Sequence, residues 1–293
     1  MPSASDMPFL NTEVHYFDSE CVGAEFKLLV GKCGMKGDAP PVVLYLPDAD
    51  LSFGGTMNAL WALQFAGWLP PILVVGIGYR IADEAETFTL RARDFTPSVD
   101  AEVVKMYGWA VGGAPGFHRF IKEELKPWVA ETFDVDPNDD VFCGDSLGGL
   151  FGAYVLLTEP GTFKRYGIGS PSLWYDRGYT FELEASYARS HDDLAAKVFF
   201  SIGEYENPEG HQRHLAWLPD DERAQAEEEA AKEEAAFGVV DMVADQERLV
   251  SALRSRNYPS LVMDCEVQPG EFHMTVPQLN FTRSMRYLFD APR

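Results

Sequence analysis

Short apolar runs alternate along the chain with longer stretches in which apolar residues recur every three or four positions. The run 42–46 is apolar throughout and 71–77 is nearly so, which is typical of strands buried on both faces of a parallel sheet. Further strands are predicted at 14–17, 25–30, 141–144, 165–170, 197–203 and 261–267. Helices are predicted at 57–67, at 116–133, from 147 onward and in a segment that ends near 256.

This alternation predicts an α/β fold, with a mostly parallel, twisted sheet covered by helices on both faces. We find no repeat and no linker, so we expect a single domain over residues 1–293. Residues 205–237 depart from the pattern, because they carry Trp217 and then an acidic run of Glu and Ala that favours a helix. We interpret this insertion as a solvated helical face, with the edge of a lid as the alternative.

The stretch VFCGDSLGGL at 141–150 carries the strongest chemical signal. It places G-x-S-x-G between a predicted strand and a predicted helix, which is the context of a nucleophile elbow. Gly144 and Gly148 leave room for the strand and helix to pass closely, while Ser146 adopts a strained backbone conformation. The N–H of Leu147 then points to where an oxyanion would form. A serine that only caps the helix is the alternative, and the flanking pattern favours the nucleophile.

A serine nucleophile needs a base and an acid that orients the base. Of six histidines, only His273 lies in a loop directly after the last predicted strand, where the chain order serine–acid–histidine places the base. His211 and His214 are spaced i, i+3, but no carboxylate pattern supports them as metal ligands. We therefore expect His273 as the base, and no metal.

The acid is expected just after the strand 197–203, where Glu204 and Glu206 are both candidates. Strand alternation does not choose between them. A second oxyanion donor is expected in the loop after the first buried strand, as the backbone amide of Asp50 or Leu51. The acidic side chains of that loop must then point away from the oxyanion or be held by hydrogen bonds.

Charge and composition limit the classes of partner that this chain could bind. The net charge of −22 argues against nucleic acid and against anionic membrane surfaces. No run is long enough to span a membrane, and the N-terminus lacks the features of a signal peptide, so cytoplasmic is the expected location. With four cysteines, a bridge between Cys21 and Cys33 is less favoured than free thiols. We expect a small-molecule ester as substrate and no cofactor, and a homodimer stays open.

These residues together resemble the putative esterase family of α/β-hydrolases, which includes siderophore trilactone esterases, feruloyl esterases, S-formylglutathione hydrolase and the mycolyltransferases. The likeness covers nearly all of the chain outside 205–237 and is strongest with the siderophore-esterase branch. It depends on the elbow and on the segments 45–48, 76–80, 91–97, 112–121 and 170–174.

The resemblance implies an α/β-hydrolase fold and a carboxylic ester hydrolase, with Ser146 as nucleophile and His273 as base. It also implies Glu206 as the acid, with Glu204 as second choice. An acyltransferase or a feruloyl- or acetyl-type esterase would use the same triad, and a non-catalytic binding protein is the least favoured alternative. The family's Asp-Gly after the first buried strand is Asp48-Ala49 here.

Side-chain chemistry alone indicates which residues border the substrate. Tyr79, Arg80, Trp174 and Trp217 would suit an aromatic or bulky polar acyl group. Because of the net negative charge, an anionic substrate would require a local positive patch, for which Arg80 and Arg93 are the candidates.

Overall fold

The computed structural model describes residues 11–34, 40–80, 84–136 and 138–291. In these ranges the strands form one sheet in the order β1-β2-β4-β3-β5-β6-β7-β8. β1 and β2 are antiparallel to each other, and β2 is antiparallel to β4. The other six strands, β3 to β8, run parallel to one another. The strands are β1 (Thr12–Ser19), β2 (Ala24–Cys33), β3 (Val42–Leu46), β4 (Ile72–Tyr79), β5 (Asp140–Asp145), β6 (Arg165–Gly169), β7 (Ala196–Gly203) and β8 (Leu261–Gln268).

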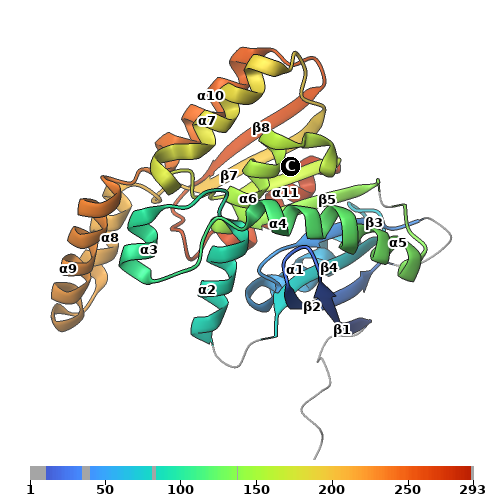
Figure 1. Cartoon of the computed structure of the whole chain (residues 1–293), viewed down its shortest axis with the longest axis horizontal. Helices are drawn as coiled ribbons and strands as arrows, with labels where there is room; N and C mark the ends of the chain where they lie inside the picture. The colour runs from blue at the N-terminus through green and yellow to red at the C-terminus, as the bar shows by residue number, and fades with distance from the viewer. Residues whose placement is uncertain (1–10, 35–39, 81–83, 137, 292–293) are drawn as a thin grey trace, which may run out of the picture.

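Helices cover both faces of this sheet, which confirms the predicted α/β arrangement (Figure 1). One apolar core lies between the sheet and helices that include α4, α5, α6 and α10, and a second core lies under α1 and α11. The helices are α1 (Ala49–Phe65), α2 (Glu84–Phe95), α3 (Ala101–Tyr107), α4 (Ala114–Arg119), α5 (Lys126–Phe133), α6 (Leu147–Thr158), α7 (Tyr175–Ser190), α8 (Pro208–Trp217), α9 (Asp220–Phe237), α10 (Met242–Arg256) and α11 (Pro277–Leu288).

The helix predicted at 116–133 contains an irregular stretch. A π-helical segment, Phe120–Leu125, joins α4 to α5, and the N–H of Lys126 donates to the carbonyl of Ile121, five residues back. Pro127 follows at once and has no N–H to donate, so the regular ladder is already broken there.

Helix α1 begins at Ala49, directly after the first buried strand, rather than at Met57. The prediction began it too late because Gly54 and Gly55 lower helix propensity. Gly55 lies directly against α11, since a Cβ there would meet the side-chain amide of Gln278, which would have to move aside. Close approach of two helices has therefore overridden local propensity.

The insertion 205–237 forms α8 and α9, which lie beside α3 at the left edge of Figure 1. Helix α9 has no buried residue, as expected for a solvated acidic helix. It contacts the rest of the chain through Glu233, which accepts a 2.7 Å hydrogen bond from the Tyr107 hydroxyl, and through Phe237, whose ring lies 5.2 Å from that of Trp174. The four cysteines are free thiols, and no helix in the described ranges combines the length and apolarity that crossing a bilayer requires.

Candidate active site

Ser146 occupies the turn between β5 and α6 with φ 59° and ψ −121°, the strained conformation expected of a nucleophile elbow. Gly144 of the motif has the predicted steric role, whereas Gly148 faces the loop that carries Asp48. A Cβ at Gly144 would lie 2.6 Å from the carbonyl oxygen of Gly148, closer than any side chain tolerates. The strand and helix can cross at this distance because Gly144 lacks a side chain.

Three side chains from distant parts of the chain meet at this turn. His273, from the segment between β8 and α11, lies with Nε2 3.1 Å from Ser146 Oγ and Nδ1 2.5 Å from Oε2 of Glu206. Glu206 follows β7 and is 6% exposed. An ionised carboxylate only accepts hydrogen bonds, so the imidazole proton sits on Nδ1 and Nε2 is free to accept from the serine. This order can pass a proton from Ser146 to His273.

The structure separates the two candidate acids. Glu204 is exposed, and its Oε2 accepts a 2.8 Å hydrogen bond from the N–H of Gly270. It therefore braces the loop that carries His273, while Glu206 contacts the imidazole itself. Residue patterns alone left both glutamates open and only the resemblance favoured Glu206, because the choice depends on how the chain turns after β7.

The first turn of α6 and that of α1 both lie close to Ser146. Leu147 begins α6, so its N–H precedes any intrahelical acceptor. Leu51 does not fit as the second donor, because its N–H donates to the carbonyl of Asp48 at 2.9 Å. Asp50 lies in the first turn of α1, where amides lack intrahelical partners, so its N–H remains the candidate. The loop lies beside the elbow, since a Cβ at Gly148 would meet Asp48 at 3.3 Å.

The acidic side chains of this loop are held away from an oxyanion. The carboxylate of Asp50 accepts a 2.7 Å hydrogen bond from the N–H of Tyr79 and pairs with Lys27. The carboxylate of Asp48 receives two 2.8 Å hydrogen bonds from the guanidinium of Arg91. The loop next to Ser146 thus carries two carboxylates whose charges are already compensated.

Three of the expected substrate residues lie in other surroundings. Tyr79 is 3% exposed and its hydroxyl donates to Asp94, so it belongs to the core and not to a substrate surface. Arg80 pairs with Glu25 at 2.9 Å, at the end of β4. Arg93 makes a two-pronged contact with Asp94 at 2.7 and 2.8 Å. Each arginine of the predicted positive patch therefore lies beside a carboxylate, and the patch stays a prediction.

The two tryptophans differ. Trp174 is half-buried, and its ring lies near Tyr175 as well as Phe237. Tyr175 and Phe237, the two ring neighbours of Trp174, belong to an apolar cluster against which Leu147 also packs. Trp217, at the end of α8, is 91% exposed and is not part of that cluster.

No cluster of three or more His, Cys, Asp or Glu side chains that could hold a metal ion occurs in the described part of the chain. Sequence reasoning missed the polar groups behind the acid. Glu206 Oε1 accepts hydrogen bonds from the hydroxyl of Ser170 at 2.6 Å and from the N–H of Gly203 at 2.7 Å. Asn280 donates in turn to Ser170 and to Asp145. The position of Ser170 at the end of β6 was the only signal available.

A mostly parallel sheet covered by helices on both faces, with a serine elbow after the central strand β5, defines an α/β-hydrolase. Residues 37–257 match the model of the family described as "Putative esterase", and the chain belongs to that family. It is therefore a carboxylic ester hydrolase.

Several relatives in this family are siderophore esterases. The chain is 31% identical over 228 residues to the ferri-bacillibactin esterase BesA of Bacillus subtilis (strain 168), covering 72% of this chain and 75% of that protein. It is 30% identical over 145 residues to the siderophore triacetylfusarinine C esterase of Aspergillus fumigatus, covering 48% and 47%. Among solved structures, the BES protein from Bacillus cereus superposes with a TM-score of 0.75 at 25% identity, with 98% of both chains covered. The siderophore hydrolase EstA from Aspergillus nidulans shares the fold with a TM-score of 0.79 at 21% identity, again over 98% of both chains.

Proposed function

We propose that this chain is a serine esterase that cleaves its substrate through a covalent acyl-enzyme on Ser146. One observation carries the proposal: an unbroken hydrogen-bonded line from Ser146 Oγ through His273 to Glu206, with heavy-atom distances of 3.1 and 2.5 Å. Both distances are within the range needed for proton transfer and for orienting the imidazole.

The reaction follows from this geometry. Ser146 Oγ attacks the ester carbonyl carbon while His273 Nε2 takes its proton, and Glu206 stabilises the resulting imidazolium. The tetrahedral intermediate collapses when the C–O bond to the alcohol breaks and His273 returns the proton to the departing oxygen. Water then attacks the acyl-enzyme with His273 again as base, which releases the acid and restores Ser146.

The charge that develops on the carbonyl oxygen needs donors that are already in place. The N–H groups of Leu147 and Asp50 are the proposed pair, one from the first turn of each helix beside the elbow. Each such donor contributes roughly 3–4 kcal/mol to transition-state stabilisation in comparable sites.

The relatives named above support a siderophore-type ester as the substrate. Charge narrows this class, because Arg80 and Arg93 are paired with Glu25 and Asp94 and offer no free positive charge. With a net charge of −22 on the chain, we expect an ester with little net negative charge of its own.

Replacement of Ser146 by Ala tests the proposal. We expect turnover of a p-nitrophenyl ester and of a cyclic siderophore lactone to fall to background, with a melting temperature close to that of the unmodified protein. Activity that survives in Ser146→Ala would overturn the acyl-enzyme mechanism.

A further inference from the structure

A closed set of polar side chains lies behind Glu206, on the side away from His273. It brings together Ser170 after β6, Ser201 on β7 and Asn280 on α11, all at most 1% exposed. The set ends at Asp145, the residue before the nucleophile, at the end of β5. Four elements thus converge on the carboxylate that orients the base.

The hydrogen bonds of this set can run in only one direction. The Ser201 hydroxyl donates to Asn280 Oδ1 at 2.6 Å, which fixes the orientation of the amide. The Asn280 amide nitrogen then donates one hydrogen to Asp145 Oδ1 at 2.7 Å and the other to Ser170 Oγ at 3.0 Å. Because Ser170 accepts from Asn280, its own hydrogen goes to Glu206 Oε1, 2.6 Å away.

The backbone at Ser170 supports the same reading. This residue has φ 38°, a conformation that non-glycine residues rarely adopt, and its N–H donates to the carbonyl of Ser201 at 2.7 Å. Strain of this kind persists where the surroundings over-determine a residue, and it gathers at functional sites. Gly169 beside it has no room for a side chain, since a Cβ there would collide with the carboxylate of Asp145.

We propose that Ser170 and Asn280 are positioning residues of the esterase, which act by fixing the rotation of the Glu206 carboxylate so that Oε2 faces His273. The inference depends on the proposed roles of Ser146, His273 and Glu206. Two donors on Oε1, the Ser170 hydroxyl and the Gly203 N–H, leave Oε2 as the only oxygen directed at the imidazole. Fully satisfied networks of this kind rigidify a site beyond the sum of their single bonds.

A double-mutant cycle separates positioning from a general structural role. The single variants Ser170→Ala and Asn280→Ala should lower kcat on a p-nitrophenyl ester about 10-fold, with KM within about twofold, because binding is untouched and only the orientation of the base suffers. In a Glu206→Ala background both losses should vanish, since the carboxylate through which they act is gone.

Ser284→Ala is the matched control. Ser284 lies one turn after Asn280 on the same helix, is 2% exposed and faces Gly167 of β6, away from Glu206. We expect this variant to keep the kcat of the unmodified protein at a comparable melting temperature. If Asn280→Ala does not fold, Ser170→Ala with its own cycle decides the question.

The proposal is overturned if the kcat of Ser170→Ala equals that of Ser284→Ala, or if its loss persists undiminished in the Glu206→Ala background. These results differ from a failure of the proposed function itself. In that case Ser146→Ala would keep its activity whatever the cycle showed.

Discussion

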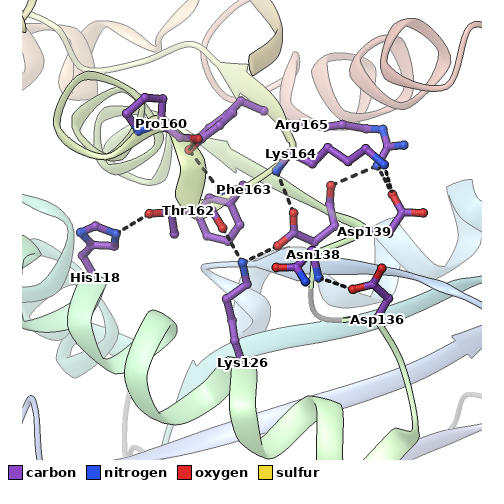
Figure 2. Close-up of polar contacts among 12 residues, drawn as sticks. His118, Lys126, Asp136, Asn138, Asp139, Pro160, Thr162, Phe163, Lys164 and Arg165 are labelled. Atoms are coloured by element: carbon purple, nitrogen blue, oxygen red, sulfur yellow. Dashed lines mark hydrogen bonds and ion pairs between the residues drawn. The ribbon is translucent and has the colours of Figure 1, made fainter. Parts of the chain in front are cut away.

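The two ends of strand β5 carry opposite kinds of polar cluster. At its amino end, Asp140 pairs with Lys126 at 2.6 Å and accepts the N–H of Lys164 at 2.8 Å. The neighbouring Asp139 pairs with Arg165 and with the side chain of Lys164. Figure 2 shows Lys126, Lys164 and Arg165 with their side chains directed toward the aspartates at the start of the strand. Every carboxylate in this cluster faces a permanent positive charge.

At its carboxyl end, the carboxylate of Asp145 accepts a 2.7 Å hydrogen bond from the neutral amide of Asn280. The titratable groups that face it are His273, Glu206 and Asp48. Burial raises the pKa of Asp145 to about 7, and the amide of Asn280 and the nearby His273 only partly oppose this rise. This end of the strand therefore carries a carboxyl group, that of Asp145, whose pKa lies near neutral pH.

The comparison indicates how one strand serves both stability and chemistry. Burial also raises the pKa of Asp140, but Lys126 opposes it with a full charge that does not depend on the substrate. A cation placed equally close to Glu206 would compete with His273 for its negative charge. The amino end thus holds the strand in place, and the carboxyl end is left free for proton transfer.

The largest expected effect is a loss of kcat when the cluster at the carboxyl end of β5 is disrupted. Glu206→Gln should lower kcat roughly 10⁴-fold, because an amide cannot stabilise the imidazolium and favours the wrong tautomer. The matched control is Glu204→Gln, two residues away, which removes a charge but keeps an oxygen that can accept from the Gly270 N–H, and should keep kcat within about twofold. Steady-state kinetics on a p-nitrophenyl ester compares the two. Equal losses would show that Glu206 does not act through His273.

The next largest effect is a loss of stability when the cluster at the amino end of β5 is disrupted. Lys126→Met leaves Asp140, whose side chain is 1% exposed, as an unpaired buried carboxylate. The free energy of unfolding at neutral pH should fall by about 3–5 kcal/mol, while kcat per folded molecule stays unchanged. Asp139→Asn removes the ion pair with Arg165. Because the Asp139 side chain is 38% exposed, the free energy of unfolding should fall by no more than about 1 kcal/mol. Urea unfolding measures both, and a loss of kcat in folded Lys126→Met would contradict the division between the two ends.

The smallest expected effect is a change in how stability depends on pH, which compares Asp145 with the charge-paired aspartates at the other end of β5. The pKa of Asp145 is raised from 3.8 to about 7 in the fold, so the folded state holds a proton that the unfolded chain has already released. Its contribution to stability is therefore present at low pH and is lost as pH rises through about 7. Asp145→Asn removes this loss, so its stability relative to the unmodified protein should increase from pH 5 to pH 8. Melting temperatures across this range provide the measurement, and a constant difference would contradict the assignment.

Much of the fold could be predicted from the sequence, because strands buried on both faces of a parallel sheet have continuous apolar sequences. Val42–Leu46 was placed correctly for this reason. Helix boundaries depend on packing that cannot be inferred from the sequence, as the contact of Gly55 with α11 illustrates. The π-helical turn before Pro127 was equally hidden, since the apolar periodicity runs through it.

For the site, motif and chain order sufficed to predict where Ser146 and His273 lie. The resemblance favoured Glu206 over Glu204, but only the turn after β7 shows why the two glutamates differ. The pairing of Arg80 and Arg93 needed their neighbours in space. The position of Ser170 at the end of a strand is a weak signal and Asn280 carries none, because a buried serine and a helical asparagine occur in any core. Their arrangement is visible only where β6 and α11 meet.

Mass spectrometry of the protein quenched during turnover tests the central claim most directly. With a slowly hydrolysed ester, the account predicts an added acyl mass on the peptide that contains Ser146, and none in Ser146→Ala. Steady turnover with no acyl adduct, or with the adduct on another residue, would contradict it.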